Sequence, residues 1–166
     1  MAKYVTKYFG EIIFDETGDE IDFDVVFNGQ EINICFNEIS LYRDKIQLCW
    51  DIVDQYEKLN EMAKNAIIEY FPQTKGAVNY YFKCHFEDDI LDEDELVEVF
   101  GANDFEKIDI KSVVEKMTYP DLNIWLNKNN ELDICPDYKV APEYSDEILC
   151  IKMDSKFNII EFVHES

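Results

Sequence analysis

The hydrophobic period of this sequence changes twice along the chain, and this change restricts the fold more than any other feature. Apolar and polar residues alternate over 21–27 and 31–36, which is the period of a half-buried strand. Asn28-Gly29 separates the two runs and favours a type I′ turn, because that turn needs positive φ at both central residues. The sequence therefore predicts a β-hairpin here, preceded by a strand over 8–14.

From Asp44 onward the period becomes 3.6, the apolar stripe includes Trp50, and the pattern continues until Pro72. Asp44 and Gln47 fit a capping box, which predicts the start of a helix. A straight helix of this length would measure about 42 Å, whereas a globule of this size has a radius of gyration of about 15 Å. We therefore expect one long helix lying across a sheet, or a break near residues 59–61.

Three shorter segments follow. Residues 78–86 alternate and predict a strand. The stretch 87–98 is strongly acidic, and its apolar residues predict a short helix that Gly101 ends. Residues 109–117 predict a second short helix.

The period returns to two at residue 121, where 121–135 predicts a second hairpin. Pro136 and Pro142 are expected to break the following stretch into a loop, and 147–165 predicts a third hairpin. Hairpins at both ends with helices between them predict an α+β fold without alternating βαβ units. We expect an antiparallel sheet, built from N- and C-terminal hairpins and packed against a long central helix, in a single domain over 1–166.

The charge balance excludes several classes of partner. The chain has 37 acidic residues against 15 lysines and arginines, a net charge of −22, and Arg43 is the sole arginine. Nucleic acid and anionic membrane surfaces both require clustered basic residues, so neither is expected as a partner. No apolar window is long enough for a membrane span or a signal peptide, which predicts a cytoplasmic location.

The five cysteines are odd in number, scattered, and surrounded by apolar or aromatic neighbours: Cys35, Cys49, Cys84, Cys135 and Cys150. This pattern predicts buried, reduced thiols, and the spacing of a structural zinc site is absent. On the expected strand, the Cys84 thiol and the His85 imidazole would point to opposite faces, which disfavours a catalytic pair.

No motif for catalysis, phosphate binding or metal binding occurs, so we expect no catalytic residues, no metal and no cofactor. The calcium-loop pattern fails after Asp15, because its sixth and twelfth positions hold Glu20 and Val26. A small hydrolase using His85 or His164 with carboxylates is an alternative, and it requires a pocket in which both histidines converge.

Two acidic segments, 15–24 and 87–98, exceed what an ordinary surface carries. They either keep the protein soluble by repulsion or form a docking face for a basic protein. On the second reading, the partner-binding residues are the acids around the start of the expected short helix: Asp88, Asp89, Asp92, Glu93, Asp94 and Glu95.

Four features in this order resemble a family of small acidic bacterial proteins classed as a domain of unknown function. They are YFGEIIFD over 8–15, the Asn28-Gly29 hairpin, the helix with Trp50, and IIEFVHES over 159–166. Related families are similar to immunity proteins of polymorphic-toxin loci, which neutralise a toxin by direct binding. The resemblance implies a non-enzymatic inhibitor of a basic toxin and transfers no catalytic residues. A nucleic-acid mimic that blocks a DNA-binding enzyme is the second candidate.

Overall fold

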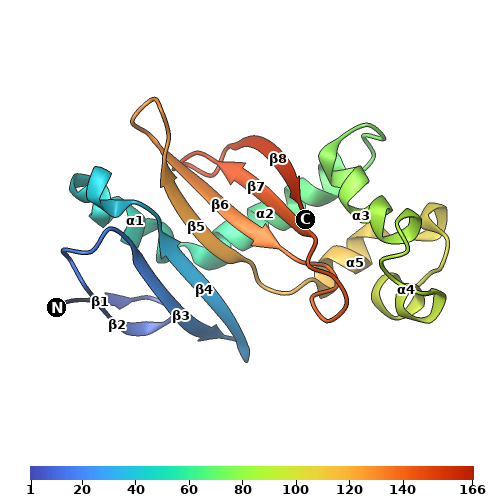
Figure 1. The fold of residues 1–166 in the computed structure, drawn as a ribbon, viewed down its shortest axis with the longest axis horizontal. Coiled ribbons are helices and arrows are strands. Elements are labelled where there is room, and N and C mark those ends of the chain that lie inside the picture. Colours follow the sequence, from blue (N-terminus) through green and yellow to red (C-terminus); the bar gives the residue numbers. More distant parts are fainter.

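The computed structural model describes residues 1–166 and contains two sheets and five α-helices (Figure 1). The small sheet pairs β1 (Ala2–Thr6) with β2 (Gly10–Phe14). The large sheet has six strands in chain order: β3 (Ile21–Phe27), β4 (Gln30–Phe36), β5 (Asp121–Leu126), β6 (Leu132–Tyr138), β7 (Ile148–Met153) and β8 (Ile159–Glu165). The helices are α1 (Ile46–Val53), α2 (Tyr56–Tyr70), α3 (Ala77–Glu87), α4 (Glu93–Phe100) and α5 (Ile110–Lys116).

The α+β class is confirmed, with hairpins at both ends of the chain and helices between them. One pairing departs from the expected antiparallel sheet, because β4 and β5 lie parallel, with Ile34 opposite Leu122 and Phe36 opposite Ile124. Parallel neighbours need a long crossover connection. Here the connection contains all five helices, so the prediction that no such crossover exists was wrong at this one position.

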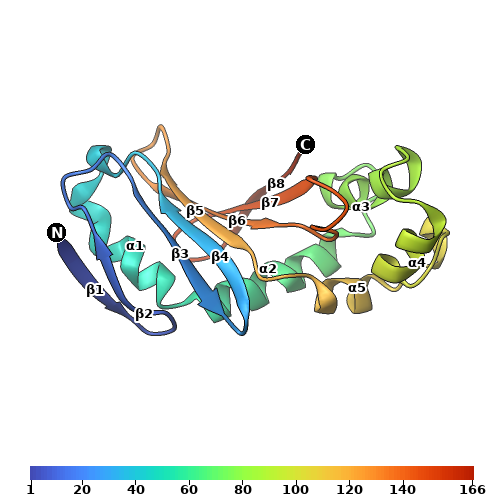
Figure 2. The ribbon, with the colours of Figure 1, turned by 60° about the horizontal axis from the view of Figure 1, so that its bottom comes forward.

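The helices α1 and α2 and the β1–β2 hairpin cover one face of the large sheet (Figure 2). Trp50 of α1 joins these layers, since its ring stacks on Tyr4 at a centroid distance of 4.7 Å and also contacts Phe23 and Phe36 of the sheet. The side chains of the sheet that face this layer are mainly apolar, and together with the buried side chains of the helices they form one hydrophobic core. The opposite face of the sheet has no helix packed on it, as the same view shows.

The long helical segment breaks at Asp54 and Gln55, not at residues 59–61. The Asp54 carboxylate accepts hydrogen bonds from the Tyr4 hydroxyl at 2.9 Å and the Lys7 backbone N–H at 2.7 Å, and these bonds tie the break to the β1–β2 hairpin. Asn60 remains helical because it is buried and its side-chain oxygen accepts a bond from a sheet tyrosine. The expected capping box at Asp44 is also wrong, because α1 begins after a short 3-10 turn with no side-chain cap.

The segment predicted as a strand over 78–86 is helix α3. Its buried side chains include Val78, Tyr81, Phe82 and His85, which follow the i, i+3, i+4, i+7 spacing of a helical face. The same sequence also alternates, so the period alone permits both structures. Packing against β7 and β8 decides in favour of the helix, and Cys84 and His85 consequently do not point to opposite faces.

Two further local predictions are confirmed, and one is wrong. Asn28 and Gly29 adopt φ of 49° and 81°, as the predicted hairpin turn requires, and Gly101 ends α4 with φ of 73°. Pro136, expected in a loop, lies within β6. The β6–β7 pairing is interrupted beside it, between the pairs Ile134–Met153 and Asp137–Cys150, because proline has no N–H to donate.

No helix in the structure combines the length and the apolar composition needed to cross a membrane.

Candidate functional site

The predicted docking residues lie around the start of α4. Asp88, Asp89, Asp92, Glu93 and Asp94 are exposed and Glu95 is half-buried, and none of the six forms an ion pair with a cationic side chain. Asp92 and Glu95 have a structural role, because they form a capping box: each carboxylate accepts the other residue's backbone N–H at 2.9 Å. Acidic residues in the first turn also interact favourably with the helix dipole. Part of this charge therefore stabilises the helix that carries it.

A second acidic surface covers the side of the large sheet that no helix contacts, and we call it the open face. All six strands contribute to it, and their alternation places eight carboxylates and one lysine there. The acids are Asp22, Asp24, Glu31, Asp121, Asp133, Asp137, Glu161 and Glu165, and the lysine is Lys152. Only Asp22 and Asp24 belong to a segment that the sequence marks as acidic.

The open face brings like charges together within the strand ladder. Asp121 of β5 lies directly opposite Asp137 of β6. Burial, with added repulsion from Glu165 and Asp121, raises the pKa of Asp137 to about 6. The Lys152 ammonium pairs with Glu161 at 3.5 Å, so the only base on this face neutralises one of its eight acids. The open face consequently carries a strong negative field.

A hollow of about 560 Å³ lies on the open face above β5 to β8. Its lining includes Trp125, which is 41% exposed, together with Val163, Cys135 and Cys150. Carboxylates of the open face surround these side chains. The missing pairing at Pro136 lies beneath this hollow. An exposed aromatic ring surrounded by carboxylates suits a basic side chain, because the ring attracts the cation and the acids pair with it.

A third group consists of Cys84, Glu147 and His164, which we call the Cys84 cluster. It joins α3, the residue before β7, and β8 near the C-terminus. The His164 Nε2 atom bonds to the Glu147 carboxylate and lies 4.0 Å from the Cys84 Sγ atom. The side chains of His164 and Glu147 are only 16% and 17% exposed. Both contacts use the same imidazole nitrogen, whereas a catalytic triad needs the acid on one nitrogen and the nucleophile on the other.

His85 lies beside this cluster, but its hydrogen bond is to a backbone carbonyl outside the cluster. Its Nδ1 atom donates to the Tyr81 carbonyl at 2.9 Å and is 3.6 Å from the Cys84 Sγ atom. The Nε2 atom is buried without a partner, and burial lowers the pKa of the imidazole, which keeps it neutral. Both histidines therefore lie near the Cys84 Sγ atom, His85 through Nδ1 and His164 through Nε2.

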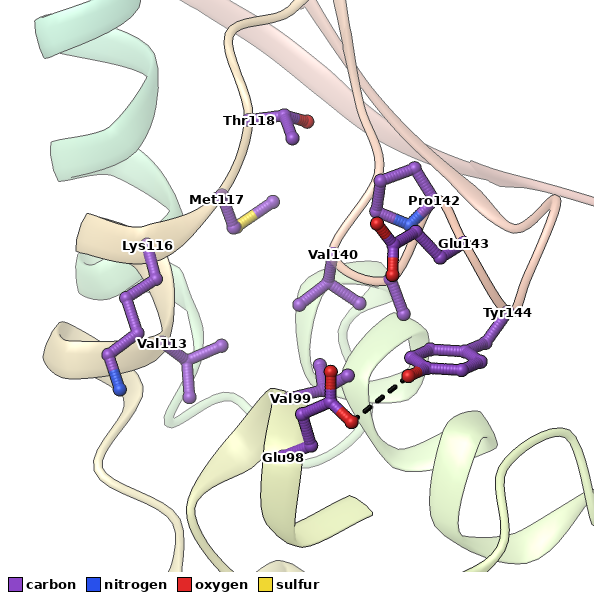
Figure 3. A pocket seen from close by; sticks show the side chains of 11 residues that line it. Glu98, Val99, Val113, Lys116, Met117, Thr118, Val140, Pro142, Glu143 and Tyr144 are labelled. Carbon is purple, nitrogen blue, oxygen red and sulfur yellow. Dashed lines mark hydrogen bonds between the residues drawn. The ribbon is translucent and has the colours of Figure 1, made fainter. Parts of the chain in front are cut away.

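A second hollow, of about 240 Å³, lies between α4, α5 and the loop after β6 (Figure 3). The Tyr144 hydroxyl donates to the Glu98 carboxylate at 3.0 Å on one side of it, while Val99, Val113 and Met117 supply apolar surface. The hollow is smaller than most ligand sites, and the hydrogen bond between Tyr144 and Glu98 already pairs these two polar groups with each other. We therefore assign it no role.

All five cysteines are free and buried, as the sequence predicts. Comparisons with protein-family models, with curated proteins and with solved structures found no match to this chain.

Proposed function

We propose that this chain is a non-enzymatic binding protein that holds a basic protein on its open face, as an immunity-type inhibitor of a basic toxin. The observation that carries the proposal is the placement of eight carboxylates and one lysine on a sheet face that no other element covers. A cationic protein surface is the complement of such a face. The five free thiols suit a reducing cytoplasm, where such an inhibitor would act on a toxin inside the cell.

The open face is costly to the fold, which favours a functional reason for it. Aspartate is depleted in strands, and like charges directly opposite each other, such as Asp121 and Asp137, destabilise a sheet. Natural sequences depart from such local rules mainly at functional sites. Solubility alone does not need acids in these positions, because loops and helix ends hold charge at lower cost.

Two matched variants test which acidic surface binds. The open-face variant carries Asp133→Asn, Glu161→Gln and Glu165→Gln. The α4 variant carries Asp92→Asn, Glu93→Gln and Asp94→Asn, removes the same charge, and keeps a side chain that can cap the helix. We pass the soluble proteins of the cells that encode the chain over each immobilised protein, and purify and identify what is retained.

We expect the wild type and the α4 variant to retain the same basic protein, and the open-face variant to lose it. Equal retention by the two variants, or loss only from the α4 variant, contradicts the proposed site. The retained protein should then lose its toxic activity when mixed with the wild-type chain.

The nucleic-acid mimic is the second candidate, and one observation favours it. Acids recur at alternate positions or at every fourth position along β3, β6 and β8, so the open face has regular rows of negative charge. If the retained protein is a DNA-binding enzyme and duplex DNA competes with the chain for it, the mimic is the correct reading. Inhibition of a basic toxin without DNA competition supports the immunity-type function.

A further inference from the structure

We propose that the Cys84 cluster binds one transition-metal ion of the zinc class, through Cys84 Sγ, a Glu147 carboxylate oxygen and His164 Nε2. One thiolate, one imidazole and one carboxylate are all ligand types that zinc accepts. Three protein ligands leave a fourth position for water or an external ligand. The inference is independent of the open face, which lies on the other side of the sheet from His164.

The three donor atoms lie close enough together to share one ion. One ligand atom from each residue lies within 4.8 Å of the other two. A tetrahedral zinc ion with ordinary bond lengths holds its sulfur and nitrogen ligands about 3.5 Å apart, close to the 4.0 Å between Sγ and Nε2. The carboxylate and the thiol both approach the same imidazole nitrogen, so the three donors face one point.

The surrounding fold holds the donors in place. His164 pairs with Leu149 in the β7–β8 ladder, and Tyr80 and Tyr81 flank its ring at centroid distances of 5.4 and 5.5 Å. The Glu147 backbone N–H donates to the Ser145 hydroxyl at 3.1 Å, which fixes the residue before β7. Cys84 and His164 are thus held by a helix and a strand, and the Glu147 carboxylate would exchange its direct bond with His164 for a bond to the ion.

Charge and access also suit a cation. No lysine or arginine pairs with Glu147, whose only ionic partner is His164. A shallow groove that includes Gly76, Tyr80 and His164 connects the imidazole to solvent and provides an access route.

The test titrates the reduced, chelator-treated full chain with Co²⁺, and then displaces it with Zn²⁺. Cobalt bound by a thiolate gives a sulfur-to-metal charge-transfer absorption that oxygen-only binding to surface acids does not give. We expect this absorption to saturate at one equivalent and to disappear when zinc is added. Cys84→Ser should abolish it, while the control Cys150→Ser should leave it unchanged.

His164→Gln and Glu147→Gln keep the thiol and provide a second test if Cys84→Ser does not fold. We expect each to weaken cobalt binding by at least about tenfold, whereas His85→Gln should change it less than threefold. Three outcomes overturn the proposal: no charge-transfer absorption in the wild type, the same absorption in folded Cys84→Ser, or unchanged cobalt affinity in both His164→Gln and Glu147→Gln.

Discussion

The α4 segment and the open face carry similar charge in opposite structural settings. Around α4 the acids are consecutive in sequence, exposed, and placed at a helix N-terminus, where Asp92 and Glu95 cap the backbone. On the open face the acids come from five strands, and Asp137 is half-buried opposite Asp121. The first arrangement stabilises its own element, whereas the second places repelling charges within the sheet, which hydrogen bonds from Asn33 and Asn123 offset in part. A run of acids in sequence is therefore a weaker sign of a binding surface than acids that the fold assembles against their mutual repulsion.

The largest expected difference between the two surfaces is in association kinetics with the basic partner. The open-face variant should slow association by about tenfold to a hundredfold at low salt, because charge complementarity acts mainly on the on-rate. The α4 variant should change it by less than about threefold, since its charge is remote from the contact. Surface plasmon resonance at several salt concentrations measures both rates. If the α4 variant slows association more, the sequence-predicted residues form the docking surface after all.

The next largest effect is on the stability of the fold. Ionisation of Asp137 lowers the stability as pH rises, whereas ionisation of a salt-bridged acid raises it. The pKa of Asp137 is raised from 3.8 to about 6, so the folded chain binds more protons than the unfolded chain between these values. Its contribution to stability therefore falls as pH rises from about 4 to about 6. Asp137→Asn should stabilise the protein by about 1–2 kcal/mol at pH 8 and by little at pH 4.

Urea unfolding at the two pH values measures this difference. Asp94→Asn is the matched control, because it removes one exposed carboxylate outside the open face. A stabilisation by Asp137→Asn that is the same at pH 4 and pH 8 would mean that its charge is not the cause.

The α4 segment gives a smaller effect of the opposite sign. Asp92→Ala removes the side chain that accepts the Glu95 N–H, and should destabilise the protein by about 1 kcal/mol. Asp92→Asn should lie within a few tenths of a kcal/mol of the wild type, because asparagine caps helices equally well. Thermal unfolding of both variants separates the cap from the charge. Equal destabilisation by both would assign the effect to the lost charge.

Features set by neighbouring residues could be predicted from the sequence. The turn at Asn28-Gly29 and the end of α4 at Gly101 depend on backbone conformations that few residues adopt, and both were predicted correctly. The hairpins β5–β6 and β7–β8 also follow from local alternation and turn residues.

Features decided by tertiary contacts could not be predicted in the same way. The α3 segment fits two periods, and only its packing on β7 and β8 selects the helix. The break at Asp54 depends on hydrogen bonds from Tyr4 and Lys7, nearly 50 positions earlier. Local sequence contains no sign of either partner.

The candidate sites were missed for the same reason. Alternation in β3 places Asp22 and Asp24 on one face, but it does not say which strands lie beside β3. The open face therefore exists only once the strand order is known. Cys84 and His164 are 80 positions apart, so no spacing motif could indicate that they meet.

The parallel pairing of β4 with β5 has a consequence for how the protein folds. The two strands meet over three residue pairs only, and the chain must close a loop containing every helix before they can do so. Hairpins form from neighbouring residues within microseconds, whereas closure of so long a loop is slow and entropically unfavourable. The β3–β4 hairpin and the β5–β8 ladder should therefore form separately and join last. Until that final step the acids of the two halves remain far apart, so a partly folded chain has no complete surface to offer a partner.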